Sequence, residues 1–212
     1  MSLHQYRTYF NNINLNDLSG DFKDSASVSV IILEKNSDHE LIFIQRQKNP
    51  NDPWSGHIAF PGGKKSPVDQ EFIDVALRET YEEIGIQLKH SQLIGRLNDL
   101  QGRKSGHLQN FFIRPYLFFL SASDATNLNF QLNQNEVQNI LTVSMQKLFS
   151  QESSSQIQVS YQNRQHSLPA IQIDEYQIWG LTYLILHELQ QHLNHLHILK
   201  SSYVLPAYPK FK

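Results

Sequence analysis

The stretch "SGHIAFPGGKKSPVDQEFIDVALRETYEEIGI", residues 55–86, places a double glycine shortly before a segment that carries three glutamates close together. Proline and glycine at 61–63 predict a turn. A helix is expected to follow, with Ser66 or Asp69 as its N-terminal cap. It should end at Gly85, because glycine readily adopts the left-handed conformation that terminates helices. The stretch therefore predicts a glycine turn that leads into a charged helix.

The glutamates of this helix fall on one side of it. With about 100° of rotation per residue, Glu79, Glu82 and Glu83 lie within about 100° of one another. The opposite side carries residues suited to burial, namely Ile73, Leu77, Thr80 and Ile84. Like charges at this spacing repel by only about 0.2–0.5 kcal/mol per pair, so a solvated acidic face is the simplest interpretation.

A metal site is the alternative interpretation of the same residues. Clustered carboxylate oxygens are the ligands that Mg²⁺ and Mn²⁺ prefer, and a bound cation would remove the repulsion. The double glycine lets the backbone approach a ligand closely and leaves a carbonyl free to coordinate it. No lysine stands four residues after a glutamate to neutralise the cluster, and Arg78 borders it. These features favour a divalent-metal site.

The same residues resemble the Nudix box, in which Gly, five residues, Glu and seven residues precede Arg-Glu-U-x-Glu-Glu-x-Gly-U, where U is apolar. Five residues separate Gly63 from Asp69, and the core from Arg78 to Ile86 follows the pattern. Asp69 replaces the first Glu, eight residues separate it from Arg78, and Thr80 stands at an apolar position. The expansion by one residue and the aspartate are similar to the coenzyme A pyrophosphatase branch.

The resemblance extends over about residues 26–196. "SGHIAFPGG" is similar to the upstream signature of that branch, His-x-Gly-x-Val/Ile-x-Phe-Pro-Gly-Gly, with Trp54 in the place of the His. "NQNEV" (133–137) resembles a loop in which many relatives place a further metal-binding or base glutamate, here Glu136. "IWGLT" (178–182) resembles the start of the branch's terminal helix.

The resemblance implies an α/β/α sandwich around a central mixed β-sheet, an α+β or α/β fold. It implies water attack on phosphorus in a pyrophosphate, with Mg²⁺ or Mn²⁺ as cofactor. The implied metal ligands are Gly62, Glu79, Glu82 and Glu83. The implied catalytic residues are Arg78, Glu79, Glu82, Glu83 and Glu136, with Arg78 orienting the glutamates. The implied substrate contacts are Arg46, Trp54 and Gly63.

Coenzyme A or a derivative is the substrate that the resemblance favours. ADP-ribose, nucleotide sugars, dinucleotides and nucleoside triphosphates are alternatives, because Trp54 departs from the branch signature. A nucleotide-binding module without turnover is a further alternative. Loss of a box glutamate would be typical of such a module, and Glu79, Glu82 and Glu83 are all present.

The composition of the chain limits which kinds of site, location and partner the protein can have. The chain has 212 residues, a net charge of −2 and no cysteine. The lack of cysteine excludes disulfides and thiolate metal sites, and with no expected signal peptide or membrane anchor it fits a cytoplasmic protein. The near-neutral charge argues against nucleic acid or a membrane as partner. Small nucleotide-type molecules remain as partners, with a possible homodimer.

The rest of the chain predicts a strand-rich domain over 26–200, after a leader at 1–25 and before a tail at 201–212. The expected strands cover 27–33, 40–47, 57–60, 92–98, 110–120 and 136–145, with a short helix at 146–150, a hairpin at 157–173 and a terminal helix at 174–196.

Two further patterns in this part of the chain are discounted. "HELQQH" (187–192) has one residue too many for a zinc motif, so His187, His192, His195 and His197 are expected on a polar helix face. Trp179 is expected to pack in the core. For Trp54, stacking on a base and packing in the core are about equally favoured.

Overall fold

The computed structural model describes residues 3–35, 38–50, 54–104, 107–161, 164–199 and 201–209. Its centre is a mixed sheet whose main strands run in the order β3 (Ile58–Ala59), β2 (His39–Arg46), β1 (Asp24–Glu34), β7 (His107–Leu120) and β5 (Leu93–Arg96). The strands β1 and β7 are parallel, whereas β2 pairs antiparallel with β1. Three more strands join it, β4 (Gly62–Lys64) on β1, β6 (Leu100–Lys104) on β7 and β8 (Val137–Ser144) on β2.

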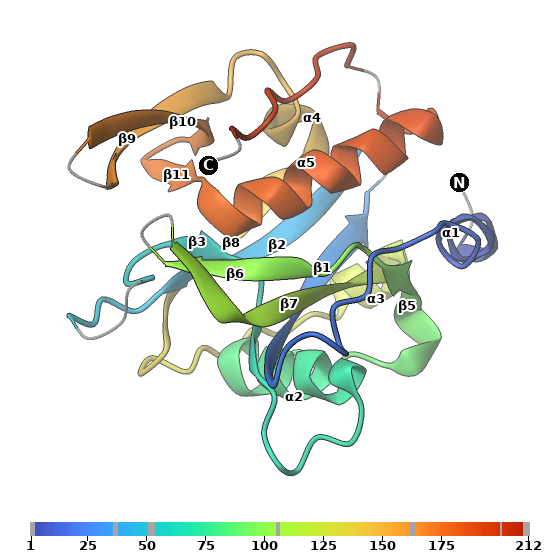
Figure 1. The fold of residues 1–212 in the computed structure, drawn as a ribbon. Helices are drawn as coiled ribbons and strands as arrows, with labels where there is room; N and C mark the ends of the chain where they lie inside the picture. The colour runs from blue at the N-terminus through green and yellow to red at the C-terminus, as the bar shows by residue number, and fades with distance from the viewer. Residues whose placement is uncertain are drawn as a thin grey trace.

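Both faces of this sheet are buried. Along β1, Ile31 and Leu33 belong to one apolar cluster, and Val30 and Ile32 belong to the other. This alternation arises because successive strand side chains point to opposite faces. The helix α2 (Phe72–Ile84) covers the first face, and α5 (Gly180–His195) covers the second, as Figure 1 shows. The predicted sandwich of helices around a mixed sheet is confirmed.

A second, three-stranded antiparallel sheet packs beside α5. It consists of β9 (Ser154–Tyr161), β10 (Arg164–Ile173) and β11 (Tyr176–Ile178). The predicted hairpin at 157–173 is confirmed, but the terminal helix does not begin at 174. Asp174 has a φ of 53° in a turn, β11 follows, and the helix starts at Gly180. Ile171 and Ile178 pair in register and are buried, which favours a strand there.

The start of α2 also differs from the prediction. Its N-cap is Glu71, whose backbone N–H donates to the carboxylate of Asp74 at 2.8 Å. Asp69, predicted as a cap, instead accepts from the backbone N–H of Ser66 at 2.7 Å and binds an arginine of the helix. The predicted end at Gly85 is confirmed, with a φ of 75°.

The remaining short elements connect these layers. The predicted strand at 136–145 and short helix at 146–150 correspond to β8 and α4 (Met145–Leu148). Besides β11, the elements that sequence patterns did not predict are β4, β6, η1 (His90–Gln92) and α3 (Ala122–Thr126). Within the described residues, no helix combines the length and the apolar character needed to cross a membrane.

The segments at the two ends of the chain contribute to the larger apolar cluster. The leader forms α1 (Leu3–Phe10), from which Tyr6 and Phe10 are 0% and 2% exposed. Leu205, in the predicted tail, is 2% exposed in the same cluster. The domain limits of 26 and 200 stay a prediction, although both flanking segments pack against the domain.

We expect Phe10→Ala to lower the free energy of unfolding by about 3–5 kcal/mol, because it empties a buried aromatic site. Thr8→Ala, on the exposed side of the same helix, should change it by less than about 0.5 kcal/mol. Urea denaturation of both variants measures the difference. Equal, small effects would show that the leader is not part of the cooperative fold.

Candidate active site

The helix α2 is fixed to the sheet by a buried polar contact as well as by apolar packing. The Thr80 hydroxyl lies 2.8 Å from the Ser29 hydroxyl of β1 and 2.7 Å from the carbonyl of Ala76. Thr80, Ser29 and Ile84 are all 0% exposed. Threonine at a position that is usually apolar in the Nudix box therefore satisfies a partner hydroxyl on the sheet, and its burial orients the glutamate side of the helix.

The glycine turn lies against two of these glutamates. The backbone N–H of Gly62 donates to Glu83 Oε2 at 2.9 Å. Gly62 has a φ of 152°, and a Cβ there would overlap the carbonyl of Ser27. A Cβ on Gly63 would overlap the carboxylate of Glu79. Glycine is required at Gly62, where the overlap is with backbone, whereas a side chain at Gly63 would displace the Glu79 carboxylate.

Glu83 is buried rather than solvated. It is 2% exposed, and burial raises its pKa to about 8, although the hydrogen bond from Gly62 acts in the opposite direction. Burial also raises the pKa of Glu79. The acidic face of the helix is thus only partly a solvent face, which the position of Glu83 on the helix alone does not reveal. A buried and a half-buried carboxylate so close together call for a positive partner.

Glu136 completes a group of three carboxylates. Oxygens of Glu79, Glu83 and Glu136 all lie within 4.8 Å of one another. Glu136 reaches this place because it directly precedes β8, whose pairing with β2 continues in a hydrogen bond from the Gln47 backbone N–H to the Glu136 carbonyl. The donor set is all oxygen and carries several negative charges, so it fits Mg²⁺ or Mn²⁺.

Glu82 has a different environment. Its carboxylate is 50% exposed and accepts from Arg78 Nη1 at 2.9 Å, and the same nitrogen donates to Glu79 Oε1 at 2.8 Å. Of the three helix glutamates expected to bind metal, the structure groups Glu79 and Glu83 with Glu136, and it pairs Glu82 with the arginine.

Arg78 connects the glutamates to the loop before the helix. Its Nε and Nη2 donate to the two oxygens of Asp69, each at 2.9 Å. Asp69 has a side chain only 2% exposed, and the hydrogen bonds from Arg78 lower its pKa to about 2. The bidentate pair is therefore made with the aspartate of the box, whereas each glutamate receives a single bond. Arg78 thus holds one aspartate and two glutamates in place.

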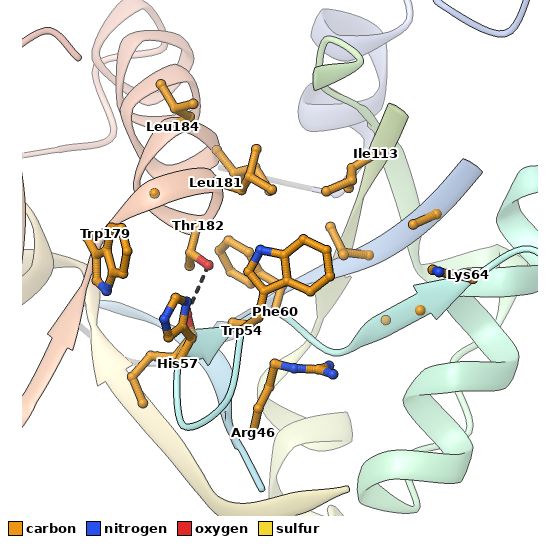
Figure 2. A pocket seen from close by; sticks show the side chains of 18 of the residues that line it. Arg46, Trp54, His57, Phe60, Lys64, Ile113, Trp179, Leu181, Thr182 and Leu184 are labelled. Carbon is orange, nitrogen blue, oxygen red and sulfur yellow. Dashed lines mark hydrogen bonds between the residues drawn. The ribbon is translucent and has the colours of Figure 1, made fainter. Parts of the chain in front are cut away.

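A pocket of about 640 Å³ opens over these residues. Of the residues expected to bind substrate or metal or to act in catalysis, all but Arg78 line it, namely Arg46, Trp54, Gly62, Gly63, Glu79, Glu82, Glu83 and Glu136. Figure 2 shows Arg46 and Trp54 at its centre, with Lys64 on the β4 side and α5 across from it.

Several lining residues were missed by sequence reasoning. Trp179 was expected in the core, but it is half-buried at the N-cap of α5, lines the pocket and contacts His57 with ring centres 4.7 Å apart. The expectation was wrong because it assumed that Trp179 lay inside the helix. Thr182, whose hydroxyl donates to the Ile58 carbonyl at 2.9 Å, joins α5 to β3 beside it.

The helix histidines have other contacts. His192 Nδ1 lies 2.9 Å from the Tyr9 hydroxyl of the leader, and its other ring nitrogen lies 3.7 Å from Glu188. Among the residues that the structure describes, the group able to hold a metal is the glutamate one, and it contains no histidine.

Comparisons with known proteins agree with this geometry. The family model for the NUDIX domain matches residues 24–161. A protein of Photorhabdus laumondii named "uncharacterized Nudix hydrolase NudL" is 33% identical over 137 residues, which cover 65% of this chain and 68% of that protein. A protein of the same name from Yersinia pestis is 28% identical over 140 residues, 66% of each chain. The alignments thus span about two thirds of these relatives.

A solved structure supports the fold alone. The MutT/nudix family protein from Enterococcus faecalis superposes with a TM-score of 0.53 and 15% sequence identity, over 92% of this chain and 70% of that one.

We predict that Glu83→Gln and Glu136→Gln each weaken Mn²⁺ binding by at least about tenfold, because affinity in such sites depends on the number of charged ligands. Titration calorimetry measures it directly. Glu152→Gln, an exposed glutamate outside the pocket, should leave the affinity unchanged. Equal affinities for all three variants would contradict a metal site at the glutamate group.

Proposed function

Because the chain belongs to the Nudix hydrolase family, we propose that it hydrolyses the pyrophosphate bond of a nucleoside diphosphate-linked molecule with the help of Mg²⁺ or Mn²⁺. The observation that carries this proposal is the group formed by Glu79, Glu83 and Glu136, whose oxygens converge within 4.8 Å at a pocket large enough for part of a nucleotide. A divalent cation bound there neutralises phosphate oxygens and lowers the pKa of a water molecule.

The other charged residues of the pocket have complementary tasks. Arg46 and Lys64 line the same pocket as the carboxylates and supply positive charge for phosphate oxygens. Arg78 holds Glu79 and Glu82 through one nitrogen, so both carboxylates keep a defined position relative to the substrate. Positioning of this kind contributes much of the rate in phosphoryl transfer.

Glu82 is the candidate for accepting the proton of the attacking water. It lines the pocket, its carboxylate is half exposed, and it stands outside the group of three carboxylates suited to the cation. A general base must reach a water near phosphorus without being used up as a ligand.

We propose coenzyme A or a derivative as the substrate. Support comes from residues 56–63, which follow the upstream signature of the coenzyme A pyrophosphatase branch, and from the pocket lining, which includes residues of α5 and of the small sheet as well as the glutamates. Trp54, which departs from that signature, lines the pocket and would lie against the substrate.

A substrate panel tests the reaction and the substrate together. We expect turnover of coenzyme A to 3′,5′-ADP and phosphopantetheine with Mg²⁺ or Mn²⁺, and none with EDTA. Its kcat/KM should exceed those for ADP-ribose, nucleotide sugars, dinucleoside polyphosphates and nucleoside triphosphates. If kcat/KM is tenfold higher for another compound of the panel, about 1.4 kcal/mol of transition-state binding, that compound replaces coenzyme A as the proposed substrate. Nucleotide binding without turnover of any member would contradict the enzymatic proposal.

A second prediction separates the base from the metal ligands. Glu82→Gln should lower kcat by about 10²–10⁴-fold, the range for loss of a general base, while leaving Mn²⁺ affinity within about twofold. Glu83→Gln should lower both quantities. If Glu82→Gln weakens Mn²⁺ binding as strongly as Glu83→Gln, then Glu82 is a ligand instead.

A further inference from the structure

The pocket has an apolar end, lined by residues from other elements than those that carry the glutamates. Leu181 and Leu184, one turn apart on α5, line it and are only half-buried. Val159 of β9 and Leu168 of β10 line it from the small sheet, and Ile113 from β7. Figure 2 shows the two leucines and Ile113 on the far side of Trp54 from Arg46. One pocket therefore joins a charged end to an apolar one.

The segment 203–208 is fastened along α5 next to this end. Gln190, which is 1% exposed, donates to the Tyr203 carbonyl and accepts from the Leu205 backbone N–H, both at 2.8 Å. Leu205 is buried in the core, and the Tyr183 hydroxyl donates to the Pro206 carbonyl at 2.7 Å. A buried glutamine satisfied at both ends by one backbone segment fixes the path of that segment.

This path brings Tyr208 into the wall of the pocket. Tyr208 is half-buried, lines the pocket and lies with its ring centre 5.9 Å from that of Tyr183. Tyr208 lies far along the chain from the Nudix box, so the box motif does not determine which residue stands at this place in the pocket. Its position depends on the contacts that Gln190 and Tyr183 make.

We infer that the apolar end, closed by Tyr208, binds an apolar arm of the substrate, such as an acyl chain attached beyond the diphosphate, and that Tyr208 is a specificity-determining residue for it. This inference rests on the proposed function for the placement of the phosphate at the glutamates. An apolar arm gains affinity by leaving water, whereas a sugar buried there would lose hydrogen bonds to water without replacement.

The test uses n-alkyl phosphates of four, six and eight carbons with Mg²⁺. They carry an anion and an apolar arm but contain no pyrophosphate bond, so their binding does not depend on turnover. The two tryptophans of the chain, Trp54 and Trp179, both line the pocket, so quenching of their fluorescence reports binding there. In the unmodified protein we expect affinity to rise by up to about fourfold per added methylene.

Three variants test the role of Tyr208. Tyr208→Ala should weaken the binding of octyl phosphate by about tenfold and change the affinity for butyl phosphate by no more than about twofold. Tyr208→Phe, which keeps the ring, should bind both compounds as the unmodified protein does. Val204→Ala, in the same segment but with a side chain 57% exposed, is the matched control. Thermal unfolding of each variant separates a lost contact from a lost fold.

Two results would overturn the inference. One is an affinity that does not change with chain length in the unmodified protein. The other is a dependence on chain length that Tyr208→Ala leaves intact. Neither result would affect the proposed hydrolysis, and failure of the substrate panel would leave the binding series unaffected. The two proposals can therefore fail separately.

Discussion

The guanidinium of Arg78 is the interaction on which the site depends most. It binds both oxygens of Asp69, one oxygen each of Glu79 and Glu82, and the carbonyl of Lys64. The glycine turn, the loop before α2 and the glutamates are thereby joined through one side chain with a fixed fork of donors. A lysine could not replace it, because a single ammonium cannot form this bidentate pair and also hold two further carboxylates.

The carboxylates of the site combine burial with close mutual approach. Glu83 is buried under the glycine turn with a raised pKa, and Glu79 and Glu136 lie beside it. Such an arrangement costs folding free energy, since a buried carboxylate must keep its proton or find a positive partner. A fold that keeps this cost in the lining of a pocket is consistent with a site selected for binding and chemistry rather than for stability.

Sequence reasoning located α2, its end at Gly85 and its glutamates because these depend on local patterns. It did not separate Glu82 from Glu83, since the two differ by which partner they meet, Arg78 or the Gly62 backbone. Glu136 was reached by resemblance alone, because its place depends on the pairing of β8 with β2. The positions of Trp179 and Tyr208 depend on how α5 begins and on the contacts of Gln190, which no short motif encodes.

The central claim is that a divalent cation binds where Glu79, Glu83 and Glu136 converge. Anomalous diffraction from crystals grown with Mn²⁺ tests it most directly. The account predicts a manganese peak within about 2.5 Å of at least one oxygen of each of these three glutamates, in the range of oxygen-ligated divalent ions. A peak held by Glu82 without Glu136, or no peak in the pocket at saturating Mn²⁺, would contradict it.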